Sequence, residues 1–208
     1  MRYFFLLSLF CVYTVGFSQE IKPFTSDEIE LISESPNEKM RVYNLNNLTD
    51  SIVLKSVSIP IPADHDLTSL LARRMLLSVQ DINHPGVGIA APQVGVNRRM
   101  IVVQRFDKPQ TPFEVFLNPE ILWASELMQK GPEGDLSFDE RGVIMRHYSI
   151  QIRYQTLEGE WKEEFLEGFT SVIFQHERDH LDGILLTDRR EEQANEIFQS
   201  THPHYLKK

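Results

Sequence analysis

The hydrophobic positions along the chain follow two periods, and each change of period marks the boundary of a predicted element. Between residues 67 and 82, apolar side chains recur every three or four positions, which places them on one face of a helix. This stripe consists of Leu67, Leu70, Leu71, Met75, Val79 and Ile82. We expect Asp64 or Asp66 to cap the first turn of this helix, and we expect the stripe to face the hydrophobic core.

Strands are predicted where the apolar period falls to two, or where short apolar runs lie between turn residues. The predicted strands are residues 51–59 ("SIVLKSVSI"), 99–104 ("RMIVVQ"), 115–119 ("VFLNP"), 148–155 ("YSIQIRYQ") and 161–166 ("WKEEFL"). The turn sequence "LEGE" separates the last two strands, so we expect them to form a hairpin in which Ile150, Ile152 and Tyr154 share one face.

A helical period returns in residues 168–181, and Gly183 is predicted to end that helix. One side of this helix carries Phe169, Val172, Ile173, His176, Glu177 and His180. The chain therefore has strands in its middle, one helix before them and one after. That order favours an α+β domain and not a wound parallel sheet.

The two ends of the chain differ from the region between them. Arg2 followed by an apolar run over residues 3–17, with small Gly16 and Ser18 before a cleavage point, predicts a signal peptide at residues 1–18. The run is shorter than the ~20 residues that span a bilayer. We expect residues 19–49 to form a polar, loosely packed arm, residues 50–190 the main domain, and residues 191–208 a C-terminal helix and surface tail.

Composition narrows the possible partners. A chain of 208 residues with a formal charge of −9 fits one domain that binds neither nucleic acid nor an anionic membrane surface. Removal of residues 1–18 takes away Arg2 and Cys11, which leaves 20 basic and 30 acidic residues, a charge of −10, and no cysteine. The mature protein therefore has no thiol to serve as a ligand or nucleophile. We expect it to be exported to the periplasm or the extracellular space, and to be a monomer without a membrane span.

The strongest chemical signal is the sequence "QHERDH" at residues 175–180, an H-E-x-x-H pattern on the second predicted helix. His176 and His180 are neighbours on the helix surface and can bind one metal ion. Glu177 lies about 100° around the helix, where it can reach a water molecule without being a ligand. The alternative is a surface helix with chance histidines. It is disfavoured because both imidazoles lie on the apolar face and need partners there.

Two histidines leave the third ligand open. Zinc proteases with this helix take their third ligand further along the chain. The downstream candidates are Asp182, Asp188, Glu191, Glu192, Glu196, His202 and His204. Most of these lie in what is predicted to be an ordinary charged helix or the tail, so the ligand is better sought upstream.

Three segments together resemble the peptide deformylase family. "GVGIAAPQ" (86–93) is similar to its first motif, Gly-x-Gly-x-Ala-Ala-x-Gln, and "EGDLS" (133–137) to its second, Glu-Gly-Cys-Leu-Ser. "QHERDHL" (175–181) is similar to its third, Gln-His-Glu-x-Asp-His. The resemblance runs from about residue 50 to about residue 188 and implies an α+β fold with mixed or antiparallel sheets around the H-E-x-x-H helix.

The resemblance also implies roles for individual residues. His176 and His180 would bind the metal, and Glu177 would act as the general base. Gln93, through its side chain, and Leu136, through its backbone N–H, would donate hydrogen bonds to the oxyanion. The residues expected to bind substrate are Gly86, Val87, Gly88, Glu133, Arg141, Phe169, Val172 and Ile173. The first three would pair with the peptide as a strand, and the last three would hold its methionine side chain.

Asp135 is the departure, because it stands where the family has a metal-binding cysteine. It could be a direct ligand, since two histidines and one carboxylate form a common hydrolytic set. It could be a poor substitute that leaves a weak or empty site for peptide binding alone, or it could be a simple loop acid. The surrounding Glu133, Gly134, Leu136 and Ser137 match the motif and disfavour the last alternative. The intact catalytic set favours the first.

We therefore predict a hydrolase that uses one divalent transition metal, Fe²⁺ or Zn²⁺, to remove the formyl group from N-formylmethionyl peptides. Outside the cytoplasm its substrate would be an N-formylated peptide or a small acylated amine. Two alternatives remain at this point: a catalytically impaired peptide-binding protein, and an exported metallopeptidase or amidase that shares only the H-E-x-x-H helix.

Overall fold

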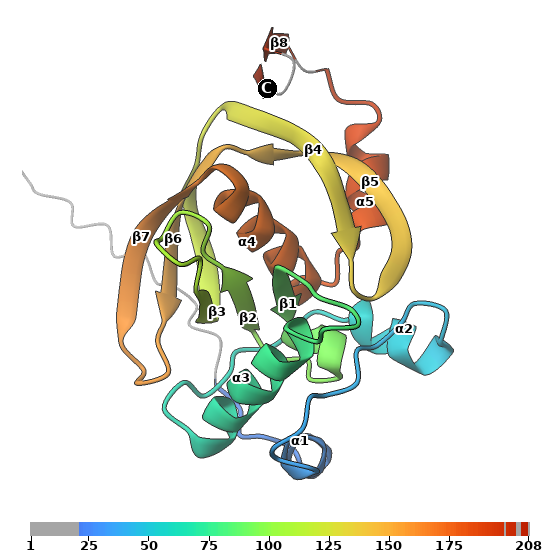
Figure 1. Ribbon diagram of the computed structural model, residues 1–208, viewed down its shortest axis with the longest axis vertical. Helices are drawn as coiled ribbons and strands as arrows, with labels where there is room; N and C mark the ends of the chain where they lie inside the picture. Colours follow the sequence, from blue (N-terminus) through green and yellow to red (C-terminus); the bar gives the residue numbers. More distant parts are fainter. Residues whose placement is uncertain (1–20, 198, 203–204, 208) are drawn as a thin grey trace, which may run out of the picture.

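The computed structural model describes residues 21–197, 199–202 and 205–207 (Figure 1). The signal peptide predicted at residues 1–18 lies outside this part of the chain. The described residues form two antiparallel sheets and a central helix, α4, which confirms the predicted α+β class. Within the described residues, the helices are too short or too polar to cross a bilayer.

The larger sheet has five strands in the order β1-β2-β3-β6-β7, each antiparallel to its neighbour. Its strands are β1 (Gly88–Ala90), β2 (Met100–Gln104), β3 (Phe113–Ala124), β6 (Ser149–Gln155) and β7 (Trp161–Glu167). The four strands predicted between residues 99 and 166 are confirmed, and β6 and β7 form the expected hairpin. Ile150, Ile152 and Tyr154 all face the core from β6.

The smaller sheet has four strands in the order β5-β4-β9-β8. Its strands are β4 (Leu127–Asp135), β5 (Phe138–His147), β8 (Gln199–His202) and β9 (Tyr205–Lys207). The prediction of a surface tail is wrong for the described residues beyond 198, because β9 pairs with β4 through backbone hydrogen bonds. Pairing of this kind depends on the backbone of a distant strand, which the polar side chains of the segment do not reveal.

The helix α4 (Gly168–Leu181) lies at the centre of the molecule, between the five-stranded sheet and the curved β4–β5 hairpin (Figure 1). Its apolar side buries Ile173, Phe174 and Leu181 against the larger sheet. The helix ends as predicted, because Gly183 has a φ of +70°, a left-handed conformation that suits glycine. The following helix, α5 (Leu186–Gln193), packs on β5, where the Gln193 side chain hydrogen-bonds both backbone groups of Met145.

The first predicted apolar stripe forms the helix α3 (Asp66–Val79). Leu71, Met75 and Val79 are fully buried, as expected. Two details of the prediction are wrong. The cap is His65, whose Nδ1 accepts a hydrogen bond from the backbone of Leu67, and Ile82 lies beyond the helix and is 90% exposed.

The strand predicted at residues 51–59 is wrong for its first half, because residues 51–54 belong to a helix, α2 (Leu48–Leu54). Asn47 caps this helix by accepting hydrogen bonds from the backbone of Thr49 and Asp50. The β-branched side chains favour a strand locally, but the cap and the burial of Leu54 select the helix. Only Ile59 takes part in a β-bridge, to Arg98.

Residues 21–49 are not a loosely packed arm. They contain the helix α1 (Ser26–Ser33), which begins with a capping box formed by Thr25 and Glu28. Phe24, Ile32 and Met40 enter the same core as α3. The segment is also held by the buried Arg98, which binds the Glu28 carboxylate and the carbonyl oxygens of Lys22 and Pro23. The prediction was wrong because the segment is polar overall and only a few apolar side chains pack it into the core.

Candidate metal centre

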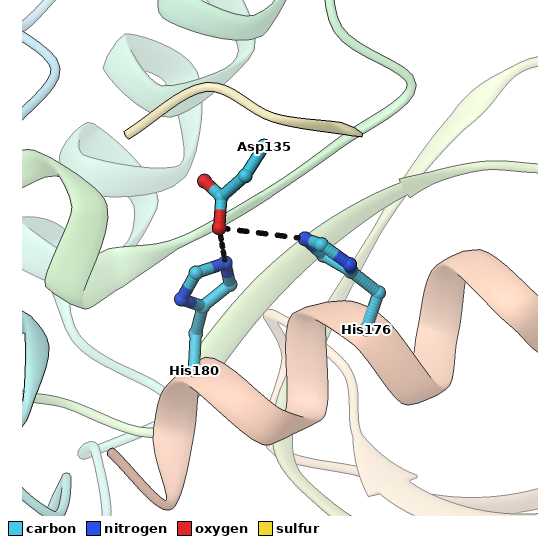
Figure 2. A group of neighbouring side chains, drawn as sticks. All are labelled: Asp135, His176 and His180. Atoms are coloured by element: carbon cyan, nitrogen blue, oxygen red, sulfur yellow. Dashed lines mark ion pairs between the residues drawn. The ribbon is translucent and has the colours of Figure 1, made fainter. Parts of the chain in front are cut away.

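Three predicted ligands converge from two elements. His176 and His180 stand one turn apart on α4, and Asp135, at the end of β4, points between them (Figure 2). Asp135 Oδ2 lies 3.2 Å from His180 Nε2 and 3.9 Å from His176 Nε2. The three ligand atoms all lie within 4.8 Å of one another. The side chain of Asp135 is only 1% exposed, so it is not a solvated loop acid.

The charges of this group favour an ionised Asp135. Burial by itself would raise the pKa of the Asp135 carboxyl group. The neighbouring His180 and His176, and the hydrogen bond from the backbone of Ser137, nevertheless hold that pKa well below its usual range. The carboxylate is therefore available as an anionic oxygen ligand.

The donor set fits a divalent transition metal. Two imidazole nitrogens and one carboxylate oxygen are ligands that both Zn²⁺ and Fe²⁺ accept. Although His180 Nε2 is close to Asp135 Oδ2, the two atoms do not form a hydrogen bond, and His180 is buried without a hydrogen-bond partner on either ring nitrogen among the described residues. A cation between Nε2 and the carboxylate would satisfy both atoms.

His176 is oriented by a second group of charges. Its Nδ1 lies 2.9 Å from Glu133 Oε2, and Arg146 donates two hydrogen bonds of 2.9 Å to the same carboxylate. Burial would raise the pKa of Glu133, but His176 and Arg146 lower it to about 2. A histidine held in this way by a carboxylate presents its other nitrogen to a metal.

This arrangement revises the expectation for Glu133 and adds residues that sequence reasoning missed. Glu133 does line the cavity, as predicted, but its carboxylate is committed to His176 and Arg146. Arg146 also donates to Asp179, which accepts two further hydrogen bonds from Arg189 of α5. Asp179 lies inside the third motif and could have been singled out. An arginine within a strand gave no signal.

Glu177 is buried and lines the same cavity as the ligands Asp135 and His176. It is 4% exposed, and its Oε2 has no hydrogen-bond partner among the described residues. Burial raises the pKa of this carboxyl group to about 7, although the nearby His176 and His180 oppose the rise. The approach of β1 is close: a Cβ atom at Gly88 would clash with the Glu177 carboxyl group, so any larger residue there would displace Glu177.

A cavity of about 770 Å³ opens in front of this group. It is lined by all but one of the predicted site residues: Gly86, Val87, Gly88, Gln93, Glu133, Asp135, Leu136, Arg141, Phe169, Val172, Ile173, His176 and Glu177. The exception is His180, which does not line the cavity and is 1% exposed. Sequence reasoning did not identify His84 on one rim, or Asp139 and Glu140 on the other. These three polar residues had no motif to distinguish them.

Gln93 and Leu136 line the cavity from two segments that are distant in the sequence, which we call its two walls. The Gln93 side chain is fixed at both ends: its Oε1 accepts from the backbone of Ala90 over 2.9 Å, and its Nε2 donates to Asp135 Oδ1 over 2.9 Å. The backbone N–H of Leu136 lies in the turn between β4 and β5 and has no partner among the described residues. It is therefore free to donate to a ligand.

The segment that precedes α2 joins these two walls. The backbone N–H of Tyr43 donates to the carbonyl oxygen of Gln93 over 2.7 Å. The backbone N–H of Leu45 donates to the carbonyl oxygen of Ser137 over 3.1 Å. Gln93 belongs to the short 3₁₀ helix η1 (Ala91–Val94), whereas Ser137 follows β4. Residues 43–45 therefore hold together two parts of the site that are distant in the sequence.

The sequence of this chain is similar to that of known proteins over the region that contains the site. The family described as "Polypeptide deformylase" matches residues 42–196. The peptide deformylase of Thermotoga neapolitana is 41% identical over 149 residues, which cover 71% of this chain and 87% of that protein. The peptide deformylase of Caulobacter vibrioides is 38% identical over 151 residues, which cover 71% and 86%.

Solved structures agree in fold. The class I type b peptide deformylase from Acinetobacter baumannii, in its Met-Ala-Ser-bound form, has a TM-score of 0.64 and 37% sequence identity. The similarity covers 73% of this chain and 98% of that one. Peptide deformylase from Thermotoga maritima has a TM-score of 0.65 and 33% identity, with 73% and 97% covered.

Proposed function

This chain belongs to the peptide deformylase family, and from that premise we propose that it removes the formyl group from peptides that begin with N-formylmethionine. The reaction adds water across the amide bond between the formyl carbon and the amino nitrogen, and gives formate and a free amine. The observation that carries the proposal is the buried carboxylate of Glu177, which lines the cavity and whose Oε2 has no hydrogen-bond partner within the part of the chain that the structure describes.

Glu177 has the properties of a general acid and base. Because its pKa is raised to about 7, it can both accept and release a proton near neutral pH. Its carboxylate takes a proton from the attacking water and returns one to the departing amine. Asp135, His176 and His180 would hold a divalent metal ion, which when bound supplies the Lewis acidity that makes water nucleophilic near neutral pH.

The formyl oxygen gains negative charge as water attacks, and the site offers donors for it. The backbone N–H of Leu136 has no hydrogen-bond partner among the described residues. Gln93 is the second candidate donor, through its Nε2. A donor that is fixed in place and unpaired before the reaction, as the N–H of Leu136 is among the described residues, stabilises the transition state without reorganisation.

The cavity fits an extended peptide with an apolar first side chain. Val172 and Ile173 line it from α4, together with Phe169 at its rim. β1 is at the end of the five-stranded sheet, and residues 86–88 border the cavity. A peptide can therefore add to the sheet as a further strand, with backbone hydrogen bonds for affinity and the apolar pocket for its methionine. The Met-Ala-Ser complex of the Acinetobacter relative supports a peptide that begins with methionine as the ligand.

Fe²⁺ and Zn²⁺ are the metals that we propose for this site. Both accept imidazole nitrogen, and the oxygen ligand of Asp135 in place of sulfur moves the preference away from soft, thiolate-favouring ions. Elemental analysis of the protein purified from cells grown with both metals would show which one is bound. Roughly one equivalent of either metal supports the proposal, and a protein that carries neither contradicts it.

The decisive experiment is formate release from formyl-Met-Ala-Ser, measured with the Fe²⁺ and Zn²⁺ forms. We expect turnover, and we expect Glu177→Gln to lower kcat by about 10²- to 10⁴-fold while metal content stays the same. Peptide binding without formate release in either metal form would contradict the proposal and establish the protein as a peptide-binding relative without catalysis.

We also propose that the protein acts as a monomer outside the cytoplasm. The location outside the cytoplasm is supported by the sequence of residues 1–18 and by the absence of cysteine from the chain that follows. Expression of the full chain in a bacterial host, followed by fractionation and N-terminal sequencing, tests it. Recovery of a monomer that begins at Gln19 is the expected result, and a protein retained in the cytoplasm with residues 1–18 still attached would contradict it.

A further inference from the structure

The two oxygens of Asp135 have different surroundings. Oδ2 faces the two imidazoles, as Figure 2 shows. Oδ1 points the other way and accepts hydrogen bonds from Gln93 Nε2 over 2.9 Å and from the backbone N–H of Ser137 over 2.8 Å. One oxygen is therefore presented to the ligand site, and the other is held by the protein.

The donor on Gln93 is itself fixed. Gln93 is 1% exposed, and its Oε1 accepts the backbone N–H of Ala90 over 2.9 Å. That contact determines which end of the carboxamide is oxygen, because a backbone N–H requires an acceptor. The second hydrogen on Nε2 is directed at Ser137 Oγ, 3.3 Å away. Both hydrogens of the amide group are thus engaged within the site.

A carboxylate needs this restraint, whereas a thiolate does not. A thiolate offers a single sulfur atom in one place. A carboxylate can rotate and can bind a cation through one oxygen or through both. Two hydrogen bonds to Oδ1 stop that rotation and leave Oδ2 as the single ligand atom, because both donors lie on the side away from the histidines.

We propose that Gln93 is a positioning residue for Asp135, which it locks as a one-oxygen ligand, and that this coupling makes an aspartate serviceable where the family motif has cysteine. The inference rests on the proposed metal site. It follows that Gln93 must give up a bond within the site before it can donate to a substrate oxygen. The N–H of Leu136 is then the donor that is ready for the oxyanion.

A double-mutant cycle tests the coupling. The four proteins are the natural one, Gln93→Met, Asp135→Cys, and the protein with both changes. Their Zn²⁺ affinities are measured by competition with a chromophoric chelator, under reducing conditions. We expect Gln93→Met to weaken Zn²⁺ binding by about 10- to 100-fold when Asp135 is present, which is the usual effect of losing a partner that orients a ligand. In the Asp135→Cys protein the same change should weaken binding by less than about threefold.

A spectroscopic measurement separates ligand geometry from general damage. The Co²⁺ forms of the natural protein and of Gln93→Met report coordination number through the intensity of their visible bands. We expect the intense bands of a four-coordinate ion in the natural protein and weaker bands, typical of more ligands, in Gln93→Met. Thermal unfolding of the metal-free proteins shows whether each is folded. Gln93→Asn, which keeps the amide but is too short to reach, replaces Gln93→Met if the latter does not fold.

The outcomes are distinct. An equal loss of Zn²⁺ affinity in both backgrounds, or no loss beside Asp135, would overturn the inference, as would unchanged Co²⁺ bands. Zn²⁺ binding does not require turnover. If the predicted cycle is found in a protein that releases no formate, the coupling stands and the proposed activity fails. If formate is released but the cycle shows no coupling, the activity stands and the inference fails.

Discussion

At the scale of single residues, the chemistry of the site depends on how burial and neighbouring charges set the pKa of each carboxyl group. Asp135 and Glu133 are buried carboxyl groups whose pKa values fall because cations and donors surround them. Glu177 is buried as deeply, but its Oε2 has no hydrogen-bond partner in the described parts of the chain, and its pKa rises to about 7. The same side-chain chemistry thus gives an anionic ligand, an orienting group and a proton carrier.

The raised pKa of Glu177 has a consequence for stability. A carboxyl group whose pKa is near 7 in the folded protein and near 4.5 when unfolded holds its proton more tightly in the fold. Its favourable contribution is present below pH 4.5 and is lost as the pH rises to 7. We therefore expect Glu177→Gln to raise the free energy of unfolding of the metal-free protein at pH 8, by on the order of 3 kcal/mol, and to leave it unchanged at pH 4. Urea unfolding at both pH values measures this, and an equal effect at the two would contradict it.

The oxygen ligand also has a chemical consequence. A thiolate at an open metal site is readily oxidised, whereas a carboxylate is not. We expect the Asp135→Cys protein to lose its deformylase activity on exposure to peroxide and the natural protein to keep it. Formate release before and after treatment, with metal restored, is the measurement. Equal sensitivity of the two proteins would show that the replacement has no protective effect.

At the scale of elements, charged side chains tie β4 and β5 to α4 and α5. Glu133 of β4 and Asp179 of α4 share Arg146 of β5, and Arg189 of α5 binds Asp179 from the outside. Arg146 is 5% exposed and forms ion pairs with two buried carboxylates, whereas Arg189 is partly exposed and forms an ion pair with one of these two. The two arginines therefore differ in what their removal leaves behind.

Matched substitutions at these arginines should separate the two positions. Arg146→Met leaves both carboxylates without their shared buried partner, and we expect it to destabilise the fold by about 3–5 kcal/mol. Arg189→Met leaves Asp179 paired with Arg146, and we expect a loss of about 1 kcal/mol. Urea unfolding of the two variants gives the comparison. An equal loss in the free energy of unfolding for Arg189→Met and Arg146→Met would contradict this prediction.

At the scale of the whole molecule, residues 21–41 form part of the same core, although they precede the part that matches the family. Ile32 is fully buried against the core that contains α3, and Arg98, itself buried, binds residues 22–28. The catalytic domain is thus built on an N-terminal segment that shares its hydrophobic interior.

Two isoleucines of α1 provide the test. Ile32→Ala removes a side chain with 0% exposure and should lower the free energy of unfolding by about 2–5 kcal/mol. Ile29→Ala changes a side chain of the same helix that is 43% exposed and should cost less than about 1 kcal/mol. Urea unfolding of both variants is the measurement, and similar small losses would mean that α1 is not part of the cooperative core.

How far the sequence predicts this molecule varies with the element. The helix α4 and the strands β2, β3, β6 and β7 show a clear period or a short apolar run and were predicted from it, whereas β4 and β5 were not predicted as strands. The segments that were mispredicted depend on single distant contacts: Asn47 as a cap for α2, Ile32 in the core, and the backbone pairing of β9 with β4. The local period of apolar residues does not show contacts between residues that are distant in the sequence.

The site was more predictable than the fold around it, because its residues lie in three short motifs. The structure brings the three predicted ligands together, and the cavity is lined by two of them, by the predicted base and by the predicted apolar residues. The residues that orient His176 through Glu133 were not predicted. Arg146 of β5 contacts Glu133 on the neighbouring strand β4 and Asp179 on the helix α4, and the sequence pattern shows neither contact. The position of Gln93 against Asp135 also required the structure, since 42 residues separate them.

The joining of the two cavity walls by residues 43–45 bears on how this protein can vary in evolution. Both hydrogen bonds are made by backbone N–H groups, to the carbonyl oxygens of Gln93 and Ser137. Every amino acid except proline supplies such a group. Selection for the spacing of the two walls therefore acts on the number of residues in this segment and hardly on their identity. Related chains could differ freely in sequence there, whereas the insertion or deletion of a single residue would move one wall against the other.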